Sequence, residues 1–151
     1  MSIIDDVQAR LKAIDPPVFS IVDDAIALSA VKGRPNATPA AYVFLKEEHA
    51  QPNTRMSGGP LLQLVEADIA VVIITDNVSD QTGGAVRTDL ETLKAKVRGA
   101  VMGMVPPSSD GQAPIEFVSG AVVNFSGGCV WHEQLFGCAL MLEEGDDNAT
   151  F

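Results

Sequence analysis

The sequence predicts one α+β domain, in which amphipathic helices pack on a mostly antiparallel or mixed sheet of four to five strands. Hydrophobic spacing is the first observation: apolar residues recur every three or four positions in some segments, as in helices, and alternate or run together in others, as in strands. The second is size, because 151 residues at 46% hydrophobic suit a single core. The third is that no linker or internal repeat divides the sequence.

The first predicted element is a helix near the N-terminus. Its apolar residues recur at helical spacing: Ile4, Val7, Leu11 and Ile14. Ser2 precedes them as a candidate N-cap, with Asp5 three residues later. A short second helix is predicted over residues 23–31, with Asp23 as its cap, and a compact strand over residues 40–46.

A long polar segment and a strand follow. Residues 47–60 have no hydrophobic period and many turn formers, which predicts a long loop or a protruding hairpin arm. One face of the next strand is apolar throughout: Val65, Ala67, Ile69, Val71 and Ile73. On its other face Glu66 and Asp68 give way to three apolar residues: Ala70, Val72 and Ile74. We therefore expect a helix of the same chain or a neighbouring subunit to cover that face.

The second half contains the clearest helix and two strands. After a turn over residues 80–84, apolar residues recur every three or four positions: Val86, Leu90, Leu93, Val97 and Val101. Two β-rich segments, over residues 115–125 and 129–142, are joined by Ser126, Gly127 and Gly128, which indicates a hairpin. The domain is expected to span residues 1–142, with an acidic, flexible C-terminal tail over residues 143–151.

Charge and composition exclude several classes of protein. Ten basic and twenty acidic residues give a net charge of −10, which opposes binding to nucleic-acid phosphates. The N-terminus lacks the features of a signal peptide, and two cysteines are too few for a disulfide framework, so we expect a cytoplasmic protein that is not secreted. The longest apolar run, residues 69–74, is far below the roughly 20 residues that span a bilayer, so no membrane role is expected.

The best candidate for chemistry is the segment GGCVWHEQLFGCALML, residues 127–142, which holds both cysteines and one of the two histidines. In a strand, Cys129 and His132 face opposite sides, and His132 and Cys138 share a side but lie about 20 Å apart. We therefore expect no catalytic residue, no metal and no cofactor, with both cysteines acting as small buried apolar residues. Only a helical segment would allow a metal site here, because Cys129 and His132 would then lie one turn apart.

Two alternatives of other classes stay open. One is a small metal- or thiol-dependent enzyme that uses Cys129, His132 and Cys138. The other is a ligand-binding module whose polar loop closes over a pocket.

Four successive segments carry a resemblance to a known family: AAYVFLKEEHAQPN, GGPLLQLVEADIAVVIITDNVSDQTGGA, LETLKAKVRGAVMGMVPP and IEFVSGAVVNFSGGCVWHEQLF. In their order and pattern, the chain resembles the tail terminator family of long-tailed phages and prophages, often labelled minor tail or tail completion proteins. The likeness covers about residues 40–142. The positions that match the family's habits are the Pro52–Asn53 pair, the Asp76–Asn77 turn, the GMVPP exit from the long helix, and Trp131 with Phe136 five residues later. Two features depart from it: His132 stands where the family often has a second aromatic residue, and an acidic tail follows Leu142.

The resemblance implies a structural protein of virion assembly, without enzymatic activity. Members of the family form a ring, generally a hexamer, that caps the tail tube and supplies the surface for joining the head. The implied partners are other copies of the chain, the tail tube protein and the head–tail connector protein. DNA would pass through the ring without specific binding, which suits a negative subunit. The protein would lie in the host cytoplasm during assembly and then in the virion tail.

A ring requires contacts between unlike surfaces of neighbouring subunits. Two sets of residues are the candidates for these contacts and for contacts with the tube. The first set belongs to the loop arm: Gln51, Pro52, Asn53, Arg55 and Met56. The second set belongs to the second face of the central strand: Val72 and Ile74.

Overall fold

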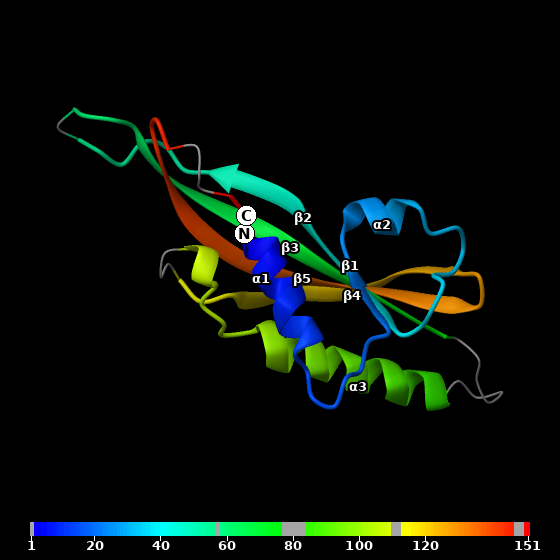
Figure 1. Cartoon of the computed structure of the whole chain (residues 1–151). Helices are drawn as coiled ribbons and strands as arrows, with labels where there is room; N and C mark the ends of the chain where they lie inside the picture. The colour runs from blue at the N-terminus through cyan, green and yellow to red at the C-terminus, as the bar shows by residue number, and fades with distance from the viewer. Residues whose placement is uncertain (1, 57, 77–83, 110–112, 147–149) are drawn as a thin grey trace.

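The computed structural model describes residues 2–56, 58–76, 84–109, 113–146 and 150–151. In these residues one five-stranded mixed sheet carries three α-helices (Figure 1). The strands are β1 (Ile21–Asp23), β2 (Ala40–Ala50), β3 (Leu62–Asp76), β4 (Glu116–Ser126) and β5 (Cys129–Glu143). The helices are α1 (Ile3–Lys12), α2 (Ala25–Ser29) and α3 (Gly84–Val101), followed by a short 3-10 turn, η1 (Pro107–Ser109).

The strands lie in the order β1-β2-β3-β5-β4, so β1 and β4 form the two edges. β1 runs parallel to β2, and all other neighbours are antiparallel. The central pair, β3 and β5, is in register along the whole of both strands, from Leu62 opposite Glu143 to Asp76 opposite Cys129. The predicted α+β class with a mixed sheet and helices packed on it is confirmed.

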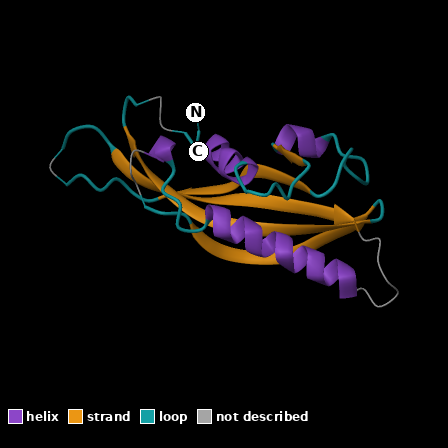
Figure 2. Ribbon diagram, turned by 60° about the horizontal axis from the view of Figure 1, so that its bottom comes forward, coloured by secondary structure: helices purple, strands orange, loops and turns teal. Residues whose placement is uncertain are grey.

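The main hydrophobic core lies between the sheet and helices α1 and α3. Alternation along β3 places all five predicted side chains in this core: Val65, Ala67, Ile69, Val71 and Ile73. Both helices contribute the apolar side chains of one stripe: Ile3, Val7 and Leu11 from α1, and Leu90, Leu93, Val97 and Val101 from α3. Figure 2 shows α3 lying along the sheet. The helical period therefore predicted the buried face of α3, and Val7 and Leu11 on α1. At the ends of α1 the prediction is wrong, because Ile3 rather than Ile4 is buried and the helix ends at Lys12, before Ile14.

The helix caps confirm one prediction and correct another. The Ser2 hydroxyl accepts the Asp5 N–H at 3.2 Å, and the Asp5 carboxylate accepts the Ser2 N–H at 2.9 Å, which closes a capping box. Helix α2 is capped by Asp24, whose carboxylate accepts the Ala27 N–H at 3.0 Å. The predicted cap, Asp23, is instead the last residue of β1.

A smaller core covers the second face of β3. Val72 and Ile74 are 4% and 0% exposed, and they pack with residues of α2 and its C-terminal flank: Ala27, Leu28 and Val31. A helix of the same chain therefore covers this face. Burial by α2 accounts for this apolar face within one copy, and the contact of Val72 and Ile74 with a neighbouring subunit stays a prediction.

The predicted polar loop is the tip of the β2–β3 hairpin. β2 continues to Ala50, beyond the predicted end at residue 46, after a register shift between Leu45 and Glu47. The described residues between β2 and β3, 51–56 and 58–61, are here called the arm and extend away from the helices (Figure 1). The alternative of a protruding hairpin arm is therefore the correct one.

The C-terminal strands β4 and β5 and the turn between them agree with the prediction. Gly127 and Gly128 have φ angles of 60° and 73°, the conformation that a tight hairpin turn requires. β5 ends at Glu143, within one residue of the predicted boundary at 142, and the Glu144 N–H donates to the Leu61 carbonyl at 2.8 Å. Phe151 packs against the main core.

Some predicted features lie outside the described residues. These are the turn at residues 80–83, the Asn77 half of the Asp76–Asn77 turn and the side chain of Val86. In the part of the chain that the structure describes, no helix has the length and apolar content to cross a membrane.

Candidate assembly surfaces

The arm is a braced loop rather than an open one. The Asn53 side-chain oxygen accepts the N–H groups of Leu62, at 3.0 Å, and of Arg55, at 3.2 Å. The Thr54 N–H donates to the Leu62 carbonyl at 2.9 Å. Asn53 therefore holds the two sides of the arm together just beyond the last strand pair, a role that its short amide side chain suits.

Arg55 ties the arm to the end of β5. Its guanidinium donates to the Pro60 carbonyl and to the Glu143 carboxylate, each at 3.1 Å. The Glu144 carboxylate accepts the Leu61 N–H at 3.2 Å on the same side. Because both charged side chains of the Arg55–Glu143 pair are partly exposed, the pair contributes at most about 1 kcal/mol. Its effect is to fix the direction of the arm.

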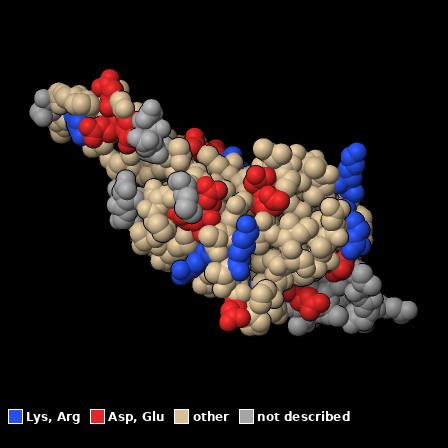
Figure 3. Space-filling view, viewed as in Figure 1, with Lys and Arg blue, Asp and Glu red and all other residues tan. Residues whose placement is uncertain are grey.

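The structure places the five predicted arm residues on one projecting hairpin. Gln51 and Pro52 lie at its base, where the Gln51 N–H donates to the Leu64 carbonyl at 2.8 Å, and Met56 is 100% exposed near its tip. Figure 3 shows acidic side chains gathered at this projecting end. A fully exposed methionine has no role in holding the fold, so its side chain is available to a partner.

The two cysteines lie in separate cores. Cys129 belongs to the smaller core, with its Sγ 3.8 Å from the Asp76 carboxylate, and Cys138 belongs to the main core. Both are free thiols. Burial raises the pKa of both thiols, that of Cys138 to about 12, so neither forms a thiolate readily near neutral pH. In the described residues, no group of three or more His, Cys, Asp and Glu side chains could hold a metal ion.

His132 is a buried packing residue under α3. It is 4% exposed, and its Nε2 lies 3.4 Å from Nε2 of Gln134. Burial lowers its pKa, and the nearby Lys94 ammonium lowers that pKa further. A Cβ added to Gly120 on β4 would lie 3.1 Å from the His132 ring, so glycine leaves room for the imidazole. His132 and Cys129 point to opposite faces of β5, and the structure does not assemble the alternative thiol site.

The two family-like aromatic residues support the core. Phe136 is fully buried and meets Phe117 edge to face, with ring centroids 5.7 Å apart at 65°. The Arg98 guanidinium lies over the Phe117 ring, 4.5 Å from its centroid. Trp131 packs on the smaller core. The Phe136, Phe117 and Arg98 contacts link α3, β4 and β5.

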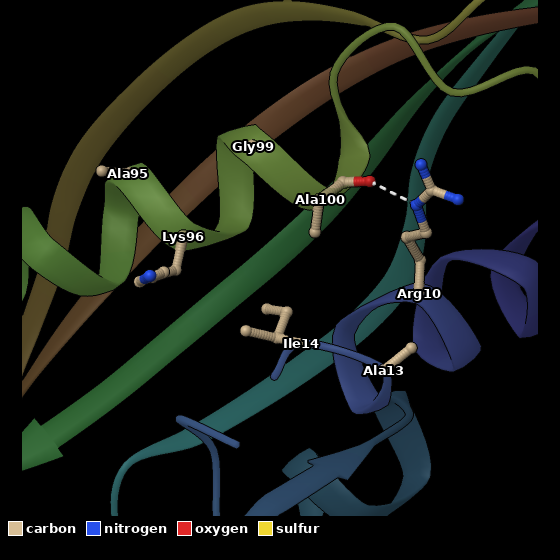
Figure 4. A pocket seen from close by; sticks show the side chains of 7 residues that line it. All are labelled: Arg10, Ala13, Ile14, Ala95, Lys96, Gly99 and Ala100. Atoms are coloured by element: carbon tan, nitrogen blue, oxygen red, sulfur yellow. Dashed lines mark hydrogen bonds between the residues drawn. The ribbon is translucent and has the colours of Figure 1, made fainter. Parts of the chain in front are cut away.

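A shallow groove separates α1 from α3 (Figure 4). Its floor is made of small residues, and Arg10 and Lys96 stand at its sides. The Arg10 Nε donates to the Ala100 carbonyl at 3.0 Å, which satisfies an acceptor near the C-terminus of α3. The arm lies at another part of the molecule, so no loop closes over this groove as the ligand-binding alternative requires.

Sequence reasoning missed the exposed apolar side chains of β4. Four of them are about half exposed or more: Val118 at 54%, Val122 at 47%, Val123 at 51% and Phe125 at 66%. The segment from Phe117 to Ser126 contains no charged residue, although one residue in five of the whole chain is charged. The absence of charged residues could have indicated an exposed apolar surface. In a sequence, however, the same absence is equally typical of a buried strand.

Comparison with known proteins identifies the family. The model of the family described as phage tail terminator protein matches residues 4–146. The chain belongs to the phage tail terminator family. Among the described residues, this match includes the arm, the five strands and the three helices except Ile3 at the start of α1. The resemblance stated from the sequence is therefore confirmed.

A solved structure has the same fold as this tail terminator. It is a chain from the virion of a native gene transfer agent particle, with a TM-score of 0.59 and 17% sequence identity, and the match covers 93% of the present chain and 96% of that chain. No curated protein matches the sequence. Membership of the family gives the protein a structural role in the phage tail.

Proposed function

We propose that this tail terminator forms a ring, generally of six copies, that caps the tail tube and offers its outer surface to the head–tail connector. The family match over residues 4–146 carries the proposal. It is a structural role without catalysis, exercised first in the host cytoplasm and then in the virion tail. The partners are other copies of the chain, the tube protein and the connector.

The arm supports this function by its shape and bracing. Asn53, Arg55 and Glu143 hold the arm in a fixed direction, and Met56 stands fully exposed near the tip. A braced projection with an apolar tip has little ordering entropy to lose on binding, which favours a contact with the tube or the next subunit. The net charge of −10 suits a channel that DNA crosses without adhering.

The test is assembly on purified tail tube. We expect native mass measurements to give a ring and electron microscopy to show it at one tube end. Met56→Glu should leave the unfolding temperature unchanged, because the side chain is exposed, and should reduce the number of capped tube ends at least tenfold. Met102→Glu is the matched control: that methionine is 58% exposed and lies just after α3, away from the arm.

Two results would change the proposal in different ways. Normal capping by Met56→Glu would remove the arm from the tube contact and leave the ring in place. A wild-type protein that stays monomeric and leaves tube ends bare would contradict the terminator function itself.

A further inference from the structure

The strongest unexplained feature outside the arm is the uncovered edge of the sheet. β4 is an edge strand of eleven residues, and in the described structure no element covers its outer side. Soluble proteins usually protect such edges with charged residues or proline, whereas Phe117 to Ser126 contains neither. Apart from Glu116 at its start, this edge is uncharged and carries exposed apolar side chains, which indicates a partner surface.

The exposed side chains of β4 lie on both faces of the sheet. Phe125 pairs with Val130 and Val122 pairs with His132, and Val130 belongs to the main core, so Phe125 and Val122 are on the face that carries α1 and α3. A Cβ added to Gly137 would lie 3.3 Å from the Val118 side chain, so Val118 is on the opposite face of the sheet, the one that carries α2. The surface is therefore a ridge of side chains along the edge rather than a flat patch on one face.

The irregular register of β4 argues against simple addition of another strand. Its pairing with β5 shifts between Phe117 and Ser119 and again between Val122 and Asn124. Each shift interrupts the regular row of backbone donors and acceptors that an added strand would use. A partner of β4 therefore has to pack against its side chains.

A second exposed apolar feature lies on α2, which packs on the face of the sheet opposite α1 and α3. Ile26 on α2 is 80% exposed, and α2 follows β1, the opposite edge strand, and packs on β2. The five residues of α2 carry no charge. Asp23 and Asp24 precede α2 and Glu116 begins β4, but Ile26 and the stretch from Phe117 to Ser126 are uncharged. In a protein of net charge −10, a contact through these apolar side chains brings together less like charge than one through acidic surface.

We propose that β4 of one copy packs against α2 of the next copy, with Phe125 and Val122 of the first beside Ile26 of the second. The inference rests on the proposed ring and specifies its contact. A contact between two unlike surfaces repeats from copy to copy and closes a ring where the rotation between copies allows it, which a contact of β4 with another β4 does not.

Paired cysteine variants test the contact directly. Ile26→Cys and Phe125→Cys are made separately and mixed with a short bis-maleimide under assembly conditions. The two native cysteines are buried, so the wild-type protein is the reactivity control. We expect a cross-linked dimer in the mixture, little in either variant alone, and a ladder of up to six copies from the double variant. Lys12→Cys, exposed at the end of α1, paired with Ile26→Cys should give none.

A charge variant gives an independent readout. Phe125→Glu should shift ring assembly to at least tenfold higher protein concentration without lowering the unfolding temperature, because the side chain is 66% exposed. Met102→Glu, with similar exposure outside the proposed contact, should assemble as the wild type does.

Three outcomes would overturn the inference. Cross-linking of Phe125→Cys with itself would show a two-fold contact of β4 with β4. A ring by native mass without the mixed cross-link would show that another surface joins the copies, and the proposed function would stand. A protein that is monomeric with and without tail tube would overturn both the ring and this contact.

Discussion

At the scale of single residues, the turn between β4 and β5 depends on two glycines in different surroundings. Both have positive φ, so any other residue there costs about 1–2 kcal/mol in backbone strain. At Gly127, an added Cβ would also lie 2.5 Å from the backbone of Gly33, whereas at Gly128 it would meet nothing within 4 Å. Gly127 therefore allows two loops to touch through their backbones.

Gly127→Ala should lower the free energy of unfolding by clearly more than Gly128→Ala, which should cost only the strain of about 1–2 kcal/mol. Urea unfolding of the two variants measures the difference. Equal losses would show that the loop at Gly33 moves aside without cost.

His132 gives the protein a pH-dependent stability. Its neighbours are Lys94, Arg98 and Glu91 on α3 and Glu133 on β5, and burial is the main cause of its lowered pKa. An unfolded histidine has a pKa of about 6.5, so between that value and the lower folded pKa the unfolded chain binds more protons. Stability should therefore be complete above pH 6.5 and fall as the pH decreases below it.

We expect the free energy of unfolding to decrease between pH 7.5 and pH 5.5, by at most about 1.4 kcal/mol per pH unit for this one proton. His132→Gln should flatten this part of the profile. Urea unfolding at several pH values makes the measurement. An unchanged slope in His132→Gln would assign the effect to other groups.

At the scale of elements, the arm should respond to loss of its brace without unfolding the domain. Asn53→Ala removes the acceptor of the Arg55 and Leu62 N–H groups. We expect hydrogen exchange of these two amides to accelerate at least tenfold, with a change in unfolding temperature of no more than a few degrees, because the arm is remote from both cores. Unchanged hydrogen exchange of these two amides would show that the remaining contacts of the arm hold its structure without the Asn53 side chain.

Periodicity predicted the elements well because it records which side chains are buried. The alternation along β3 identified its main-core face, and the three- and four-residue steps identified α1 and α3. The cap of α2 was placed one residue early, since Asp23 and Asp24 are adjacent and both suit an N-cap. Local pattern carries such information only to within a residue or two.

The candidate surfaces were only partly predictable, because they depend on long-range arrangement. The apolar second face of β3 looks the same in sequence whether α2 or another subunit covers Val72 and Ile74. The apolar run of β4 predicts a buried strand, and it is exposed because β5 inserts between β3 and β4 and leaves β4 at the edge. The arm was predictable because its polar turn formers act locally.

At the scale of the whole molecule, salt should promote assembly. Six copies would bring together six times a net charge of −10, and the distance over which charges repel shrinks from about 30 Å at 0.01 M salt to about 10 Å at 0.1 M. A contact between the apolar side chains of β4 and α2 gains from this screening. Sedimentation velocity across a salt series should show a shift from monomer to ring. Dissociation of the ring by salt would indicate an ion-paired contact instead.

The pairing of β3 with β5 also has a mechanical consequence. Both strands are fifteen residues long, about 50 Å at 3.3 Å per residue, and they are joined along their full length. The arm leaves one end of β3, while Asp76 at the other end accepts hydrogen bonds from Arg34 and Thr38, at 2.6 and 2.7 Å. A force that pulls on the arm along the axis of β3 therefore acts parallel to the strands, across all the backbone hydrogen bonds between β3 and β5. These hydrogen bonds resist the force together rather than break one after another.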